Sequence, residues 1–107
     1  MEAVRFTVFA SGSAGNAAYV ETSGARVLID CGISAKRIRE GLLSLNRTPE
    51  RLDGILITHE HSDHISGLRV FAAKLGIPIY CNRHTASEIM RFHEVKFDFR
   101  IIETGRD

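Results

Sequence analysis

The stretch that most constrains this chain is residues 55–67, Ile-Leu-Ile-Thr-His-Glu-His-Ser-Asp-His-Ile-Ser-Gly. Its apolar start predicts a buried strand and its end begins a helical pattern, so the histidine-rich part is a loop between them. In an extended segment residues i and i+2 point the same way, which turns His59 and His61 toward one point. Asp63 and His64 follow at the entrance of the helix. The stretch therefore predicts a metal site.

Neutral imidazole and carboxylate donors together suit zinc and its first-row neighbours, and the stretch contains no thiolate. Two such cations roughly 3.5–4 Å apart activate a water and hold the oxygens of a carbonyl or phosphoryl substrate. Two other interpretations stay open for these residues. Ser62 or Asp63 is also a suitable cap for the following helix, and the histidines would also suit a solvent-facing loop.

The stretch resembles the H-x-H-x-D-H-x-x-G signature of the metallo-β-lactamase superfamily, with His59, His61, Asp63, His64 and Gly67 at its fixed positions. The resemblance implies that His59 and His61 bind one metal and that Asp63 and His64 bind a second. Asp63 then also orients the attacking water, as the catalytic residue. The expected cofactors are two divalent ions, zinc first, with manganese or iron as alternatives. The flavodiiron branch usually has Glu where this chain has His61, which favours hydrolysis over redox chemistry.

Asp30 ends an apolar strand and precedes Cys31 and Gly32, which leaves a carboxylate at the end of a predicted sheet. It either faces a ligand or bonds loop amides; the resemblance implies that it supports the metal loop by hydrogen bonding without being a ligand. The glycine-rich residues 11–16 read as a plain turn or as a loop that approaches phosphate. Together with residues 30–36 and the metal stretch, they resemble the YycJ (WalJ) branch, cytoplasmic enzymes described as DNA exonucleases.

Composition excludes several classes of protein. With 107 residues, 44% hydrophobic and 25% charged, the chain fits one small globular domain. A net charge of +1 gives no general support for a nucleic-acid partner, and no segment reaches the ~20 apolar residues that cross a membrane. Cys31 and Cys81 form no C-x-x-C, so we expect free thiols and a cytoplasmic protein. His84 and His93 are isolated, and we expect surface or core histidines there.

Hydrophobic periodicity predicts a run of strands and then an alternation of helices and strands. The expected strands are 4–10, 17–22 and 26–30 in an antiparallel meander, then 54–58, 77–81 and one or two within 95–102; the expected helices are 35–45, one from Ile65 to before Gly76, and 84–92, with Asn82 or Thr85 near its cap. This order predicts an α/β fold. The resemblance specifies a metallo-β-lactamase-type αββα sandwich, of which residues 1–107 supply the N-terminal sheet-and-helix half.

The function that these observations favour is a dinuclear metal-dependent hydrolase, a nuclease of the DNA exonuclease type. Thioester, lactone or β-lactam hydrolysis is the alternative within enzymes, and a non-catalytic metal-binding module is the alternative outside them. The resemblance also implies later ligands, namely a third histidine, a bridging aspartate and a final histidine, whose motifs we do not find here. We therefore expect an N-terminal fragment with half a site. Its exposed apolar sheet face should favour self-association, with a homo-oligomer as one result.

Overall fold

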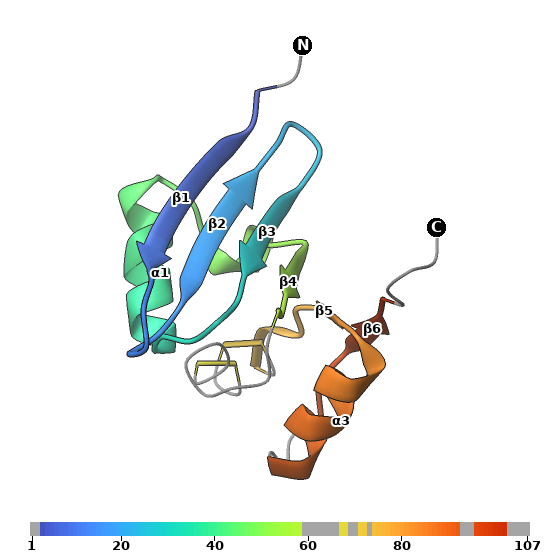
Figure 1. Ribbon diagram of the computed structural model, residues 1–107. Helices are drawn as coiled ribbons and strands as arrows, with labels where there is room; N and C mark the ends of the chain where they lie inside the picture. Colours follow the sequence, from blue (N-terminus) through green and yellow to red (C-terminus); the bar gives the residue numbers. More distant parts are fainter. Residues whose placement is uncertain (1–2, 59–66, 69–70, 73, 93–95, 103–107) are drawn as a thin grey trace.

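The first three strands form the antiparallel meander that the sequence predicts (Figure 1). In the computed structural model they are β1 (Arg5–Ala10), β2 (Ala17–Glu21) and β3 (Arg26–Ile29). The structure describes residues 3–58, 67–68, 71–72, 74–92 and 96–102. Valine and phenylalanine suit these strands because their side chains pack well on a pleated surface. Because β1 and β3 both run antiparallel to β2, they point the same way.

The second half of the sheet is parallel, because each strand is reached through a connection that crosses back over one face. Helix α1 (Ala35–Ser44) and the short 3-10 turn η1 (Pro49–Arg51) lead to β4 (Gly54–Leu56), and α3 (Arg83–Phe92) joins β5 (Ile79–Cys81) to β6 (Phe99–Ile101). The strand order is β1-β2-β3-β4-β5-β6, with β3 to β6 parallel. Strands β1 and β3 to β6 thus end along one border of the sheet, which we call the carboxyl edge.

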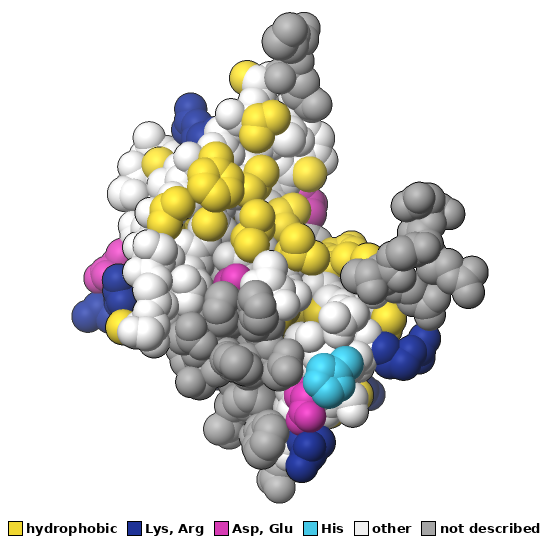
Figure 2. Space-filling view, viewed as in Figure 1, with side chains coloured by type: hydrophobic (Ala, Val, Ile, Leu, Met, Phe, Trp, Pro, Cys, Tyr) yellow, Lys and Arg dark blue, Asp and Glu magenta, His cyan; other side chains and the backbone are white. Residues whose placement is uncertain are grey.

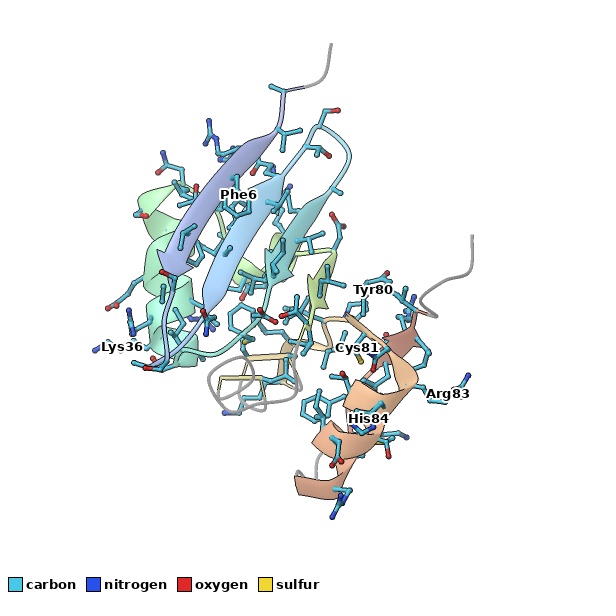
Figure 3. All side chains as sticks on the ribbon, viewed as in Figure 1. Phe6, Lys36, Tyr80, Cys81, Arg83 and His84 are labelled. Atoms are coloured by element: carbon cyan, nitrogen blue, oxygen red, sulfur yellow. The ribbon has the colours of Figure 1, made fainter. Side chains whose placement is uncertain are left out.

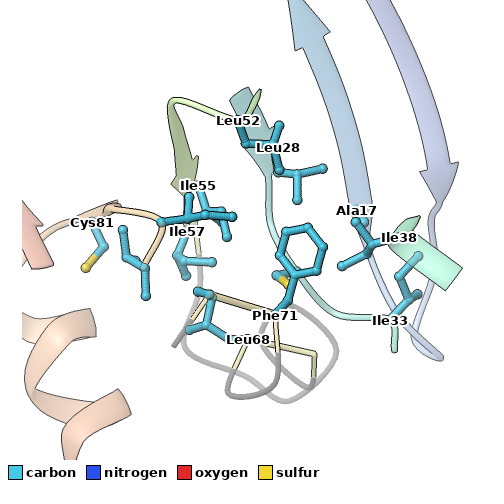
Figure 4. Close-up of a cluster of buried hydrophobic side chains, with 14 of the residues drawn as sticks. Ala17, Leu28, Ile33, Ile38, Leu52, Ile55, Ile57, Leu68, Phe71 and Cys81 are labelled. Atoms are coloured by element: carbon cyan, nitrogen blue, oxygen red, sulfur yellow. The ribbon is translucent and has the colours of Figure 1, made fainter. Parts of the chain in front are cut away.

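The predicted helix between β4 and β5 is described only in part. Leu68, Phe71 and Ala72 have helical backbone and are almost fully buried, and Gly76 follows with a φ of +67°. A glycine with positive φ is the usual end of a helix. The predicted start at Ile65 lies outside the described residues. Figure 4 shows Leu68 and Phe71 among apolar side chains from β3, β4 and α1.

One face of the sheet carries the core. The register places Tyr19, Leu28, Ile55 and Ile79 side by side on this face, and all four are fully buried. They belong to the same hydrophobic cluster as Ile38 and Leu42 of α1 and Ala86 and Ile89 of α3. The helices therefore cover this face.

The opposite face, which we call the open face, is also apolar. The same register aligns on it the side chains of Phe6, Val8, Ala18, Val20, Val27, Ile29, Leu56 and Tyr80. Phe6 is 60% exposed and Val8 55%. Figure 2 shows hydrophobic side chains gathered over β1, β2 and β3. A strand with one face exposed to water usually alternates apolar and polar residues. These strands instead present apolar side chains on both faces of the sheet.

Most helices and strands begin and end within two residues of the boundaries that the sequence predicts. Ser34 caps α1, and its hydroxyl accepts a hydrogen bond from the Arg37 amide at 3.2 Å. Asn82 caps α3, and its side-chain oxygen accepts from the Thr85 amide at 2.8 Å. Within the predicted stretch 95–102 the structure shows one strand, β6. Among the described residues, no helix is long and apolar enough to cross a membrane.

Candidate functional site

The carboxyl edge brings polar residues from three strands to one border of the molecule. Asp30 directly follows β3, Thr58 lies two residues after β4, and Asn82 directly follows β5. Ligand sites of open α/β sheets lie at this edge, because the loops that leave adjacent parallel strands meet there. The predicted metal ligands directly follow Thr58 in the chain. They are His59, His61, Asp63 and His64, and all four lie outside the described residues.

Asp30 is the described residue that contacts the start of this loop. Asp30 is 6% exposed, and its carboxylate accepts a hydrogen bond from the Thr58 amide at 2.8 Å. The Thr58 hydroxyl lies 2.7 Å from the other carboxylate oxygen. The Asp30 amide donates to the Leu56 carbonyl at 2.8 Å, so β3 and β4 stay joined beyond their last paired residues. A buried carboxylate requires such donors. The structure thus shows Asp30 bonded to the Thr58 amide, and its role beside a bound metal stays a prediction.

The backbone of Asp30 has a φ of +65°, a conformation that aspartate tolerates better than most residues. The turn redirects the chain from β3 into Cys31, Gly32 and Ile33, which are all buried. The Cys31 carbonyl accepts a hydrogen bond from the Gly67 amide at 2.8 Å. The glycine that ends the metal motif is therefore attached to the residue next to Asp30.

The glycine-rich loop 11–16 contacts the same segment from another side. The Gly32 amide donates to the Asn16 carbonyl at 2.8 Å. The Asn16 side chain closes the loop on itself, since its oxygen accepts from the Gly12 amide at 3.1 Å and its NH2 group donates to the Gly12 carbonyl at 2.8 Å. These bonds make the loop a closed turn beside the carboxyl edge.

The two cysteines are free, as the sequence predicts, and both are buried. Burial and the neighbouring Asp30 carboxylate raise the pKa of Cys31 to about 12. Burial raises the pKa of Cys81 to about 11. Both side chains are thus neutral thiols near pH 7, and they pack as small hydrophobic groups.

An open hollow of about 200 Å³ lies beside Thr58. The ends of β4 and β5 line it, with Asn82 and Ile102 at its border. His84 is exposed in the first turn of α3, and Figure 3 shows it with Arg83 and Cys81 in this part of the molecule. His93 lies outside the described residues. Within the described ranges, no group of three or more histidine, cysteine, aspartate or glutamate side chains could hold a metal ion.

The donor set after Thr58 fits divalent metals by its chemistry. Residues 59–64 contain three imidazoles and two carboxylates, which are groups that zinc and its neighbours accept as ligands. Sequence reasoning missed the contact of Thr58 with Asp30. The sequence signal for this contact is Thr58 itself, a hydroxyl residue between the apolar strand and the first histidine. Its strand would have to be paired with the strand that ends at Asp30.

The comparison with protein-family models identifies one family. The sequence profile of the Metallo-beta-lactamase superfamily matches residues 10–105. The chain is 52% identical over 81 residues to exodeoxyribonuclease WalJ of Streptococcus pneumoniae serotype 2, which covers 76% of this chain and 30% of the relative. It is 44% identical over 82 residues to exodeoxyribonuclease YycJ of Bacillus anthracis, covering 77% and 31%. The chain thus matches about 30% of the length of these relatives.

A further relative carries another name: anti-Pycsar protein Apyc1 of Paenibacillus xerothermodurans is 42% identical over 69 residues, covering 64% of this chain and 26% of the relative. Among solved structures, a metallo-β-lactamase of Cronobacter sakazakii with a HARLDQ motif matches with a TM-score of 0.77 at 20% identity, over 96% of this chain and 46% of that one. A B3 metallo-β-lactamase with an active-site glutamic acid matches with a TM-score of 0.72 at 23% identity, over 89% and 42%. The sheet and its helices correspond to somewhat less than half of these structures.

Proposed function

Because this chain belongs to the metallo-β-lactamase superfamily, we propose that it forms the metal-binding part of a hydrolase that cleaves nucleic-acid phosphodiesters, DNA first, in the manner of an exonuclease. The observation that carries the proposal is the 52% identity over 81 residues to a protein named exodeoxyribonuclease WalJ. The hydrogen bonds between Asp30 and Thr58 support it, because they fix the chain at the residue before the donor set.

In this proposal His59 and His61 hold one divalent cation, and Asp63 and His64 hold a second. Zinc suits these donors first, with manganese or iron as alternatives. The chemistry that two such cations supply is a lowered pKa of bound water and neutralisation of charge on phosphoryl oxygens. Asp63 orients the attacking water as a catalytic residue. Asp30 takes no part in bond breaking; it positions the loop by holding Thr58.

The surface for a nucleic-acid backbone would be local, because the net charge is only +1. Lys36 and Arg37 are exposed in the first turn of α1, which starts at the carboxyl edge (Figure 3). Neither forms an ion pair with another described residue, whereas Arg39 pairs with Glu50. Cations at this border attract phosphates to the edge that carries the metal loop.

The same proposal places the protein in the cytoplasm, where two free thiols stay reduced. The proposal also includes an interaction surface. Because the open face is apolar and exposed, the chain in isolation would self-associate through it. The partner that we propose there is a second copy, because the register aligns apolar residues across the face without a charge before Arg100.

Metal content is the first test. Purified without chelator, the chain should contain zinc or a neighbouring metal by elemental analysis. His59→Ala should lower that content, and Asp63→Asn should leave a folded protein whose hydrolytic activity is lost. Metal at one hundred times its dissociation constant should raise the free energy of unfolding by roughly 2.7 kcal/mol. Wild-type metal content in His59→Ala and retained hydrolysis in Asp63→Asn, with melting unchanged by chelator, would remove the assignment.

The substrate needs a separate comparison. End-labelled single-stranded and double-stranded DNA, RNA and a small nitrophenyl ester should be offered to the same preparation with metal. We expect metal-dependent binding of nucleic acid and slow shortening of DNA from its ends, since the chain spans about 30% of its exonuclease relatives. Turnover of the ester without any binding of nucleic acid would favour thioester, lactone or β-lactam hydrolysis. Metal binding without either would favour a non-catalytic module.

A further inference from the structure

The most constrained contact at the carboxyl edge involves a residue without a side chain. Gly67 ends the metal motif, and its amide donates to the Cys31 carbonyl at 2.8 Å. A Cβ built on Gly67 would lie 1.9 Å from the Ile33 carbonyl oxygen and 3.4 Å from that of Cys31. Real Cβ atoms essentially never come closer than 3.0 Å to another heavy atom. Any other residue at 67 would therefore push two stretches of backbone apart by about 1 Å.

The glycine is not needed here for an unusual backbone conformation. The described glycines with positive φ are Gly12, Gly15 and Gly76, and Gly67 does not belong to them. What position 67 requires is close approach of two main chains. Neither side can move freely. Cys31 and Ile33 are 0% and 4% exposed, and Gly67 leads into the buried Leu68.

The opposite end of the same loop is attached to the same segment. Asp30 accepts hydrogen bonds from the Thr58 amide and hydroxyl, at 2.8 and 2.7 Å. The residue next to it, Cys31, accepts from Gly67. The chain between Thr58 and Gly67 thus leaves and returns at two consecutive residues of the turn after β3. One end is fixed by a side chain and the other by backbone contact.

We propose that residues 30–33 act as a clamp on both ends of the loop that carries the metal ligands, and that Gly67 is a positioning residue of the metal site because of its contact with Cys31 and Ile33. This inference rests on the proposed function for its metal, but the clamp itself does not depend on metal. Ligands on a loop bind a cation well only when the loop ends are set, since first-shell geometry depends on the groups that support it. An alanine at 67 should therefore change metal affinity more than it changes the rest of the fold.

The chain offers a second crowded glycine as a control for Gly67→Ala. Gly54→Ala would place Cβ 2.6 Å from the Tyr80 ring, at the opposite end of β4, so it crowds a side chain where Gly67→Ala crowds backbone. It tests whether any crowded glycine has the same effect.

The first measurement needs no metal. Hydrogen exchange of the metal-free 107-residue chain should show faster exchange of the peptide spanning 58–67 in Gly67→Ala, relative to a peptide from β2 and β3. Gly54→Ala should leave the ratio of these two peptides unchanged. An unchanged 58–67 peptide in Gly67→Ala, or an equal effect of Gly54→Ala, would overturn the clamp whatever the metal does.

The second measurement is a cobalt(II) titration followed by visible absorption, with zinc competition to obtain affinities. Gly67→Ala should weaken binding by roughly 10- to 100-fold and alter the cobalt spectrum, while Gly54→Ala keeps wild-type affinity and spectrum. Wild-type affinity in Gly67→Ala would overturn its positioning role. A wild-type chain that binds no cobalt or zinc would overturn the proposed metal function and the positioning role with it, while the exchange result still decides the clamp.

Discussion

Substitutions of Asp30 should separate two contributions of this residue to stability, its hydrogen bonds and its backbone conformation. The residue must accept hydrogen bonds from Thr58, and it must adopt a φ of +65°. Asparagine tolerates the backbone conformation and keeps one acceptor oxygen. Glycine meets the backbone demand alone, and alanine meets neither. We therefore expect stability to fall in the order Asp, Asn, Gly, Ala.

The magnitudes follow from the contacts. Hydrogen bonds to a charged group contribute about 1.5–3 kcal/mol each, and desolvation of the carboxylate of the buried Asp30 offsets part of those that Thr58 donates. We expect Asp30→Asn to cost about 1 kcal/mol and Asp30→Gly about 2 kcal/mol. Asp30→Ala should cost about 1 kcal/mol more than Asp30→Gly, because a left-handed conformation penalises Cβ by more than glycine loses in unfolded-state entropy.

Urea unfolding followed by circular dichroism, with chelator present, measures this series without any contribution from metal. A loss of 2–3 kcal/mol should lower the midpoint by about 1–2 M for a chain of this size. The reasoning would be refuted if Asp30→Ala were as stable as Asp30→Gly, because the backbone conformation would then carry no cost. Wild-type stability for Asp30→Gly would show that the bonds to Thr58 contribute nothing.

Three further outcomes follow from other parts of the structure. Lys36→Ala with Arg37→Ala should weaken DNA binding and make its logarithmic salt slope shallower by about 0.7–0.9 per lost phosphate contact, whereas Arg51→Ala, before β4 at the opposite edge, should not. Hydrogen bonds from Arg47 and Tyr19 lower the pKa of Glu21 from 4.5 to about 2. The contribution of ionised Glu21 to the free energy of unfolding is therefore fully present above pH 4.5 and is lost as the pH falls toward 2. The stability of Glu21→Gln, measured by acid unfolding, should depend less on pH between 4.5 and 2. Phe6→Glu should reduce self-association in sedimentation velocity; an unchanged distribution would exclude the open face as the contact.

The order and type of the elements were predictable because they depend on local patterns. Alternating and continuous apolar runs identified the strands, and Asn82 marked a helix start that the structure confirms. The antiparallel meander followed from tight-turn residues between short strands. Boundaries moved by a residue or two, as at Thr58, because strand pairing ends where the partner strand ends and the sequence does not specify the partner.

The metal motif was likewise recognisable from the sequence alone, because four side chains that could bind a metal lie within six residues; their roles as ligands stay predictions. What only the tertiary structure decided is how the motif is held. The bond from Thr58 to Asp30 spans 28 residues, and the approach of Gly67 to Ile33 depends on β3 and β4 being parallel neighbours. A sequence shows that position 67 is glycine; whether conformation or contact requires it depends on atoms distant in the chain. The physical reason is that short-range periodicity specifies elements, whereas close packing between elements specifies which backbones touch.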